Sequence, residues 1–248
     1  MTDKDFNIEI AGEVIRIKPL FDCAYDFCKN YLTQKKESAQ VVTTPADIEF
    51  ERNTGENDGL DIPKDYPDSY LELLAIYRKA AGILLEKDIL LIHGSGISFD
   101  GKGMIFLADS GTGKSTHSTI WQQTFGDRVV MINDDKPLVK ITDGGAFIYG
   151  TPWSGKNGLN TNTCAPLKVM CEIVRSGTDE TRVEMADESA VWKILMQQTF
   201  KDVPAEGMPK ILYLLDKLQE KVPLRRIVCS PNPDAAEAAC RGLRDILE

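Results

Sequence analysis

One stretch constrains the fold of this chain more than any other: Met-Ile-Phe-Leu-Ala-Asp-Ser-Gly-Thr-Gly-Lys-Ser-Thr at residues 104–116. Its apolar run, 104–107, leads into a loop of small residues that closes on Lys114 and Ser115, and a helix-like pattern follows through Phe125. The order is therefore strand, loop, helix. That order is typical of a site where backbone N–H groups and a helix N-terminus surround a phosphate.

The loop matches the phosphate-binding template GxxxxGK[S/T] except at its first position, where Ala108 stands in place of glycine. In this interpretation Lys114 brings a cation to the phosphate, and the Ser115 hydroxyl helps to hold Mg²⁺. An ordinary strand-to-helix turn is the alternative, since glycine and serine are also common there. The residues expected to bind the nucleotide are Asp109, Ser110, Gly111, Thr112, Gly113, Lys114, Ser115 and Thr116.

Length and charge narrow the class of protein. The chain has 248 residues, 42% of them hydrophobic, which is enough for one large domain or a main domain with a smaller appendage. Its net charge of −9 argues against a nucleic-acid-binding surface. We expect a cytoplasmic protein without a membrane segment, because no apolar run approaches about 20 residues and the N-terminus lacks the pattern of a signal peptide.

The N-terminal part shows a different pattern from the rest. Alternating apolar residues on both sides of Ala11-Gly12-Glu13 predict a β-hairpin over 6–18, and 20–32 fits either a helix or a third strand. The acidic stretch from Asp47 to Asp68 reads as a solvated loop. A helix over 69–85 should follow, with Ser69 and Glu72 forming a capping box.

Strands and helices then alternate around the loop. A hairpin with its turn at Asp100-Gly101 lies directly before the loop, which implies a mixed rather than an all-parallel sheet. We expect an α/β fold with such a mixed sheet, divided into an N-terminal α+β lobe (1–87) and a nucleotide-binding catalytic domain (88–248). The other predicted elements are strands at 89–92, 129–132, 138–141, 146–149, 168–174 and 224–229, helices at 187–200 and 208–219, and a last helix that begins at Asn232-Pro233.

Charged residues at the ends of predicted strands complete a candidate site. Asp134 and Asp135 follow the strand 129–132, His93 follows the strand 89–92, and Lys156 lies in a glycine-rich loop. Ligands in such sheets bind at the carboxyl ends of strands, where a carboxylate can share Mg²⁺ with the loop hydroxyl. His93 fits equally well as a strand-end histidine with a structural role, and His117 in the loop helix fits packing better than ligand contact.

These motifs together resemble the catalytic domain of HPr kinase/phosphorylase. The resemblance rests on His93-Gly94 at a strand end, the hairpin, the Ser110-Gly111-Thr112-Gly113-Lys114-Ser115 loop, and a strand ending in Asp134-Asp135. The loop and the paired aspartates are also similar to those of phosphoenolpyruvate carboxykinases. The resemblance covers roughly residues 88–175 and implies a P-loop (Walker A) core of this type with a smaller N-terminal lobe.

The resemblance also implies a role for each matching residue. Lys114 would contact phosphate, Ser115 and Asp135 would hold Mg²⁺, Asp134 would be the general base, and His93 would lie beside the phosphates. The family's arginine-containing segment after the paired aspartates has no counterpart here. Lys156 is the candidate to stabilise the transferred phosphate in its place, although it offers a point charge and not a bidentate fork.

The expected function is ATP- and Mg²⁺-dependent transfer of the γ-phosphoryl group to a hydroxyl of a small molecule or of a peptide serine. A carboxykinase-type reaction and a nucleotide-binding regulator without turnover are the alternatives. A protein acceptor would suit a homo-oligomer with a shared groove. The sequence leaves open the acceptor, the nucleotide preference, a reverse phosphorylase reaction, the role of the N-terminal lobe and the oligomeric state.

Overall fold

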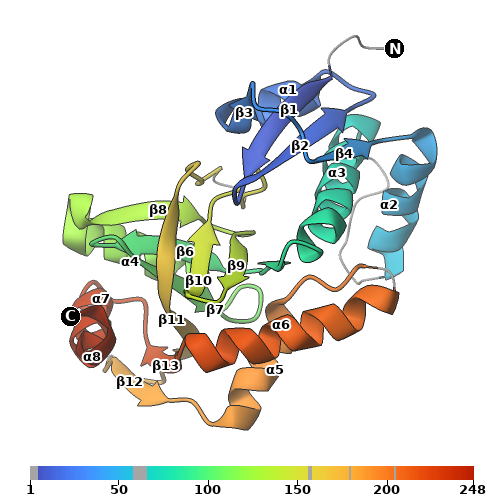
Figure 1. The fold of residues 1–248 in the computed structure, drawn as a ribbon. Helices are drawn as coiled ribbons and strands as arrows, with labels where there is room; N and C mark the ends of the chain where they lie inside the picture. The colour runs from blue at the N-terminus through green and yellow to red at the C-terminus, as the bar shows by residue number, and fades with distance from the viewer. Residues whose placement is uncertain (1–4, 58–65, 156–157, 179, 204) are drawn as a thin grey trace. The chain divides into compact units, whose positions relative to one another are not determined.

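A computed structural model describes residues 5–57, 66–155, 158–178, 180–203 and 205–248 of the chain (Figure 1). The chain divides into two compact units, Met1–Glu86 and Lys87–Glu248. Each unit contains a β-sheet of its own.

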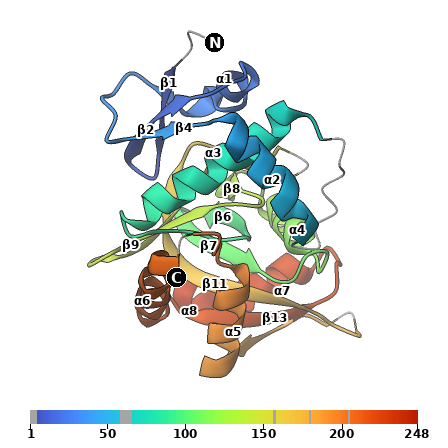
Figure 2. The same cartoon turned by 90° about the vertical axis from the view of Figure 1, so that its right-hand side faces the viewer.

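The first unit is a four-stranded sheet with helices packed on it. The strand order is β3-β1-β2-β4. The predicted hairpin is confirmed, because β1 and β2 pair antiparallel across a turn at Ala11 and Gly12, both with positive φ. Helix α2 packs along α3 (Figure 2). The elements are β1 (Phe6–Ile10), β2 (Glu13–Lys18), α1 (Cys23–Phe27), a 3-10 helix (Lys29–Tyr31), β3 (Leu32–Thr33), β4 (Ala39–Val42), α2 (Pro45–Asn57) and α3 (Asp68–Leu85).

Two predictions for this unit are wrong. The acidic stretch expected to be a loop forms α2 as far as Asn57, while residues 58–65 lie outside the described part of the chain. The predicted capping box is also absent, because α3 has no side-chain cap at its N-terminus. Glu72 is instead fully buried, and its carboxylate accepts hydrogen bonds from the backbone of Leu20 and Phe21 and from the Thr43 hydroxyl.

The second unit is built on a nine-stranded mixed sheet, as the hairpin before the loop predicted. The order is β5-β9-β10-β11-β7-β6-β8, and β13 pairs with both β11 and β12. β6 and β7 form the predicted hairpin, and β7 runs parallel to β11. The strands are β5 (Ile89–Leu91), β6 (Ser95–Phe99), β7 (Lys102–Leu107), β8 (Val129–Asn133), β9 (Leu138–Thr142), β10 (Gly145–Tyr149), β11 (Cys164–Arg175), β12 (Arg182–Met185) and β13 (Leu224–Cys229).

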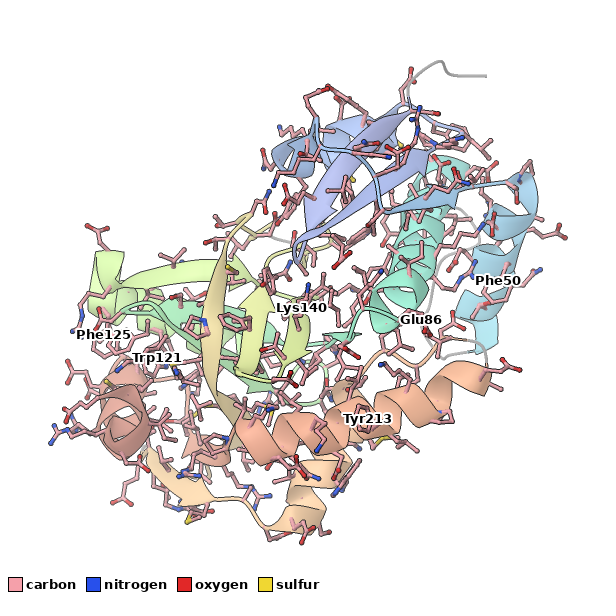
Figure 3. All side chains as sticks on the ribbon, in the orientation of Figure 1. Phe50, Glu86, Trp121, Phe125, Lys140 and Tyr213 are labelled. Atoms are coloured by element: carbon pink, nitrogen blue, oxygen red, sulfur yellow. The ribbon has the colours of Figure 1, made fainter. Side chains whose placement is uncertain are left out.

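Helices cover both faces of this sheet. Helix α4 (Lys114–Phe125) contacts β6, β7, β8 and α7, whereas α6 contacts β9 and β10. Successive residues of β7 are fully buried, as expected for a strand covered on both faces. Trp121 and Phe125 of α4, labelled in Figure 3, pack with their ring centroids 5.2 Å apart. The other helices are α5 (Glu188–Gln198), α6 (Met208–Lys221), α7 (Ala235–Gly242) and α8 (Arg244–Leu247), with short 3-10 turns at Gly126–Arg128 and Ala205–Gly207.

The predicted start of the last helix is wrong by a short distance. Asp234, not Asn232, is the N-cap residue of α7, and its side chain makes no capping hydrogen bond. Strand β12 was not predicted, because its exposed and half-buried residues give no clear apolar alternation. Among the described helices, none has both the length and the apolarity needed to cross a membrane.

Candidate functional site

The loop between β7 and α4 has the backbone conformation that its glycines allow. Gly111 and Gly113 have φ values of 75° and 123°, which other residues rarely adopt. Nothing lies within 4 Å of the position that a Cβ would take on either glycine, so the backbone is open on that side. Ala108 lacks a positive φ and is buried, which explains why alanine fits at a position where the template has glycine.

Lys114 is the buried cation of this loop. Its ammonium donates hydrogen bonds to the backbone carbonyls of Ala108, at 2.8 Å, and of Asp109, at 3.4 Å. Burial lowers the pKa of Lys114, and the negative charges of Asp135, Asp109 and Asp134 act in the opposite direction. Lys114 thus lies close to the carboxylates that the sequence had grouped with it.

Arg175, which the sequence analysis did not identify, is hydrogen-bonded to the backbone of the loop. It lies at the C-terminal end of β11, and its guanidinium donates to the backbone carbonyls of Gly111 and of Thr112, the latter at 3.1 Å. Within the loop itself, the Thr112 N–H donates to the Asp109 carbonyl at 3.2 Å. The pairing of β11 with β7 brings this arginine near the loop from far along the chain.

Asp134 and Asp135 lie just beyond the end of β8 and face different partners. The Asn133 side chain accepts hydrogen bonds from the backbone N–H groups of Asp135, at 2.9 Å, and of Lys136, at 2.7 Å. This Asx-type turn ends the strand, so the two carboxylates are not bound to the alternation of a β-strand. Asp135 pairs with Lys136 and lies 3.4 Å from His93 Nε2.

Asp134 is buried and hydrogen-bonded to a serine on a neighbouring strand. Ser95 Oγ, on β6, lies 2.8 Å from Asp134 Oδ1 and 2.8 Å from Ser118 Oγ on α4. An ionised carboxylate only accepts, so the Ser95 hydroxyl donates to Asp134. The helix that begins in the loop is thereby connected through Ser95 to Asp134. A serine within a buried strand was the only sequence signal for this contact.

His93 completes the cluster at the end of β5. Its backbone N–H donates to the Gln198 carbonyl at 2.7 Å, which fixes the strand end against the last residue of α5. Burial and the positive charge of Lys114 lower the pKa of His93, and Asp135 partly offsets them. The imidazole is therefore held toward its neutral form, able to donate or accept a hydrogen bond.

The glycine-rich loop after β10 covers the two aspartates. Asn133 Nδ2 donates to the Thr151 carbonyl and to the Trp153 carbonyl, each at 3.0 Å. A Cβ placed on Gly155 would lie 3.8 Å from Asp134 Oδ2, so this loop passes directly beside the carboxylate. Lys156, predicted to stabilise phosphate, lies outside the described residues.

His117 is part of the core beneath α4. It is buried, and its Nε2 accepts a hydrogen bond from Trp121 Nε1 at 3.1 Å. Its Nδ1 lies 3.8 Å from the Cys229 sulfur, and burial lowers the pKa of His117 to about 4. These contacts give it a packing role.

The structure thus brings together Lys114, Asp134, Asp135 and His93 at the carboxyl ends of β5, β7 and β8. Ser115 is at the first turn of α4, and Asp109, Ser110 and Thr116 lie in or directly after the loop. In the described part of the chain, no group of three or more His, Cys, Asp or Glu side chains is arranged to hold a metal ion.

The comparisons with known proteins find similarity among solved structures alone. No family model matches the chain, and no curated protein matches it. Among solved structures, the chain is similar to the Hpr(Ser) kinase/phosphatase from Coxiella burnetii, with a TM-score of 0.34 and 10% sequence identity. The match covers 62% of this chain and 94% of that chain. Because the TM-score and the sequence identity are both low, a function for this chain has to rest on the residues of the site.

Proposed function

We propose that this protein is a phosphotransferase that binds a Mg²⁺-nucleotide at residues 109–116 and transfers its terminal phosphoryl group to a hydroxyl. The observation that carries the proposal is the position of the buried Lys114 ammonium. It is hydrogen-bonded to the carbonyl of Ala108, in a loop whose two glycines have open space beside them, and the negative charges of Asp135 and Asp134 act on it.

A bound phosphate would give the Lys114 ammonium stronger hydrogen bonds than those it makes in the structure. In the structure Lys114 donates to two neutral carbonyls of its own loop. A phosphate oxygen offers a charge-assisted hydrogen bond in their place. The N-terminus of α4 faces the same loop and favours negative charge. The site therefore offers a cation and a helix N-terminus to one anionic ligand.

The residues also fit Mg²⁺ when the ion is brought by the nucleotide. Mg²⁺ keeps several waters and is usually bound by one or two carboxylates together with substrate phosphates. Asp135 and the Ser115 hydroxyl would hold the ion, which neutralises charge on the phosphates when bound.

In this proposal Asp134 is the general base. It is 6% exposed, and Ser95 occupies one carboxylate oxygen while the other lies beside Gly155. A carboxylate so fixed can accept the proton of an attacking hydroxyl that reaches it along the loop after β10. We infer an acceptor bound on that side, either a small molecule or a peptide serine.

The first prediction concerns Lys114. Replacing it with alanine should weaken ATP binding about ten- to hundredfold, because a hydrogen bond to a charged group contributes about 1.5–3 kcal/mol. Isothermal titration of ATP in the presence of Mg²⁺ measures this change. The same titration with ADP and GTP establishes the nucleotide preference.

Lys168→Ala is the matched control for this experiment. Lys168 is an exposed lysine on β11, so its loss removes the same charge without touching the loop. Its variant should bind ATP as the native chain does. Undiminished binding in a folded Lys114→Ala variant would remove the basis of the proposed function.

A further inference from the structure

A cavity opens beside the loop, on the side away from Asp134 and Asp135. Its volume is about 340 Å³, which is within the size range of small-ligand sites. It lies between the loop, the first turns of α4, the end of β11 and the turn that joins β13 to α7. Ile120, Ile173, Cys229 and Pro231 give it apolar walls. Thr116 and Ser230 add hydroxyl groups, and Arg175 adds a positive charge.

The order of strands indicates the direction in which a bound nucleotide would extend. β7, which leads into the loop, has β6 and β8 on one side and β11 with β13 on the other. The aspartates that would act on the terminal phosphate follow β8. With that end of the ligand directed toward β8, the remaining phosphates and the nucleoside extend toward β11 and β13.

Another cavity also borders the loop, and its chemistry differs. The second, of about 620 Å³, is lined by charged side chains that include Asp187, Lys193 and Arg226 from α5 and β13. A nucleobase and ribose present flat apolar surface with a few hydrogen-bonding groups, which suits the mainly apolar smaller cavity better than the larger one with its several charged side chains. The smaller cavity also opens on Gly111 and Gly113, where no side chain separates it from the loop backbone.

We propose that the cavity between the loop, α4 and the β13–α7 turn binds the nucleoside part of the nucleotide. This assignment rests on the proposed function, since it requires phosphates in the loop. The base packs between Ile120 on α4 and Pro231 after β13, and the hydroxyls of Thr116 and Ser230 are the polar groups that orient the nucleoside. The same cavity makes the end of β13 part of the ligand site, although it lies far from the loop in sequence.

The test compares two Ser→Trp variants, one at each cavity. Ser230→Trp fills the proposed nucleoside cavity, and Ser189→Trp places the same bulk in the charged cavity. Both serines are at least partly exposed, so we expect both variants to fold, which thermal unfolding verifies. Pro231→Trp, at an exposed position of the proposed cavity, provides a second variant.

Each protein is titrated with Mg²⁺-ATP and with inorganic tripolyphosphate. Tripolyphosphate occupies only the loop, so it reports on the proposed function alone. We expect Ser230→Trp and Pro231→Trp to lose at least tenfold in ATP affinity, down to that of tripolyphosphate, with tripolyphosphate binding unchanged. Ser189→Trp should leave both affinities as they are.

The outcomes separate the two proposals. If the native chain binds ATP no more tightly than tripolyphosphate, or if Ser189→Trp is the variant that weakens ATP, the nucleoside assignment is wrong while the loop site stands. If the native chain binds neither ligand, the phosphate site itself is wrong and the nucleoside assignment falls with it.

Discussion

At the scale of single residues, Asn133 determines how the candidate site is arranged. Its side chain accepts from the N–H groups of Asp135 and Lys136 and donates to the loop at Thr151. One amide thus ends β8, lets the two aspartates face different partners, and holds the covering loop over them. Sequence reasoning identified the aspartates and required the strand to end there, but it did not identify the residue responsible.

The different surroundings of the two aspartates lead to different expected effects. Asp134→Asn should reduce the rate of phosphoryl transfer about 10²–10⁴-fold with little change in Mg²⁺-ATP affinity, because it removes only the proton acceptor. Asp135→Asn should weaken Mg²⁺-dependent ATP binding as well. Steady-state kinetics and Mg²⁺ titration of both variants measure this, on an acceptor found by screening metabolites and serine peptides with γ-labelled ATP.

Asp134→Asn and Asp135→Asn are each other's controls, since both remove one charge from adjacent positions. Identical behaviour of the two variants would show that the division of roles is wrong. A protein that binds ATP but shows no transfer to any acceptor, with either aspartate present or absent, would be a nucleotide-binding regulator and not an enzyme.

At the scale of elements, α4 connects the candidate site to the core. It begins in the loop, contacts Ser95 through Ser118, and buries His117 and Trp121. The pKa of His117 lies near 4, well below its ordinary value of 6.5, because the charged imidazolium would be desolvated. The unfolded chain therefore binds a proton at this residue between about pH 6.5 and pH 4, whereas the folded chain does not.

This difference predicts a loss of stability in acid. The contribution of His117 is fully present above pH 6.5 and is lost as the pH falls toward 4, by about 2 kcal/mol between pH 7 and pH 5. Urea unfolding at these two pH values measures it. A His117→Gln variant, which keeps an acceptor for Trp121, should lose less stability over the same interval; an equal loss would contradict the assignment.

The sequence predicted most helices and strands, but it missed one helix and the long-range partners of a buried carboxylate. Short hairpins such as β1–β2 and β6–β7 were predictable because their turns carry local signals, including Gly12 and Gly101 with positive φ. Helix α2 was not, because its high charge resembles that of a solvated loop. Glu72 was assigned to a cap three residues away, whereas its partners are far along the chain.

In the candidate site, too, the sequence predicted some residues and missed others. The loop and the paired aspartates are contiguous motifs and could be read directly. Ser95, Arg175 and Asn133 matter through contacts across strands, and single residues of common types carry no signal for such contacts. The assignments of Lys114, Asp134 and Asp135 to particular chemical roles stay predictions.

At the scale of the whole molecule, the chain consists of two units with separate sheets. The described residues that we assign to the candidate site all belong to the second unit, residues 87–248. A chain of residues 87–248 alone should therefore fold and bind Mg²⁺-ATP within about threefold of the full-length affinity. Circular dichroism and calorimetric titration test this, and a folded truncation that has lost ATP binding would contradict it.

The pairing of β11 has a consequence for how this protein is made. β11 pairs with β7 through residues 167–172 and with β13 through residues 170–175. Leu243 and Leu247, near the end of the chain, belong to the same core as Phe106 and Trp121. During synthesis the loop motif therefore leaves the ribosome long before the strands and helices that pack around it. Until those elements are synthesised, apolar side chains of β7 and α4 stay exposed to solvent. The sheet can be completed only when β13 has been synthesised, so the nascent chain of this unit exposes apolar surface, and with it a risk of aggregation, until then.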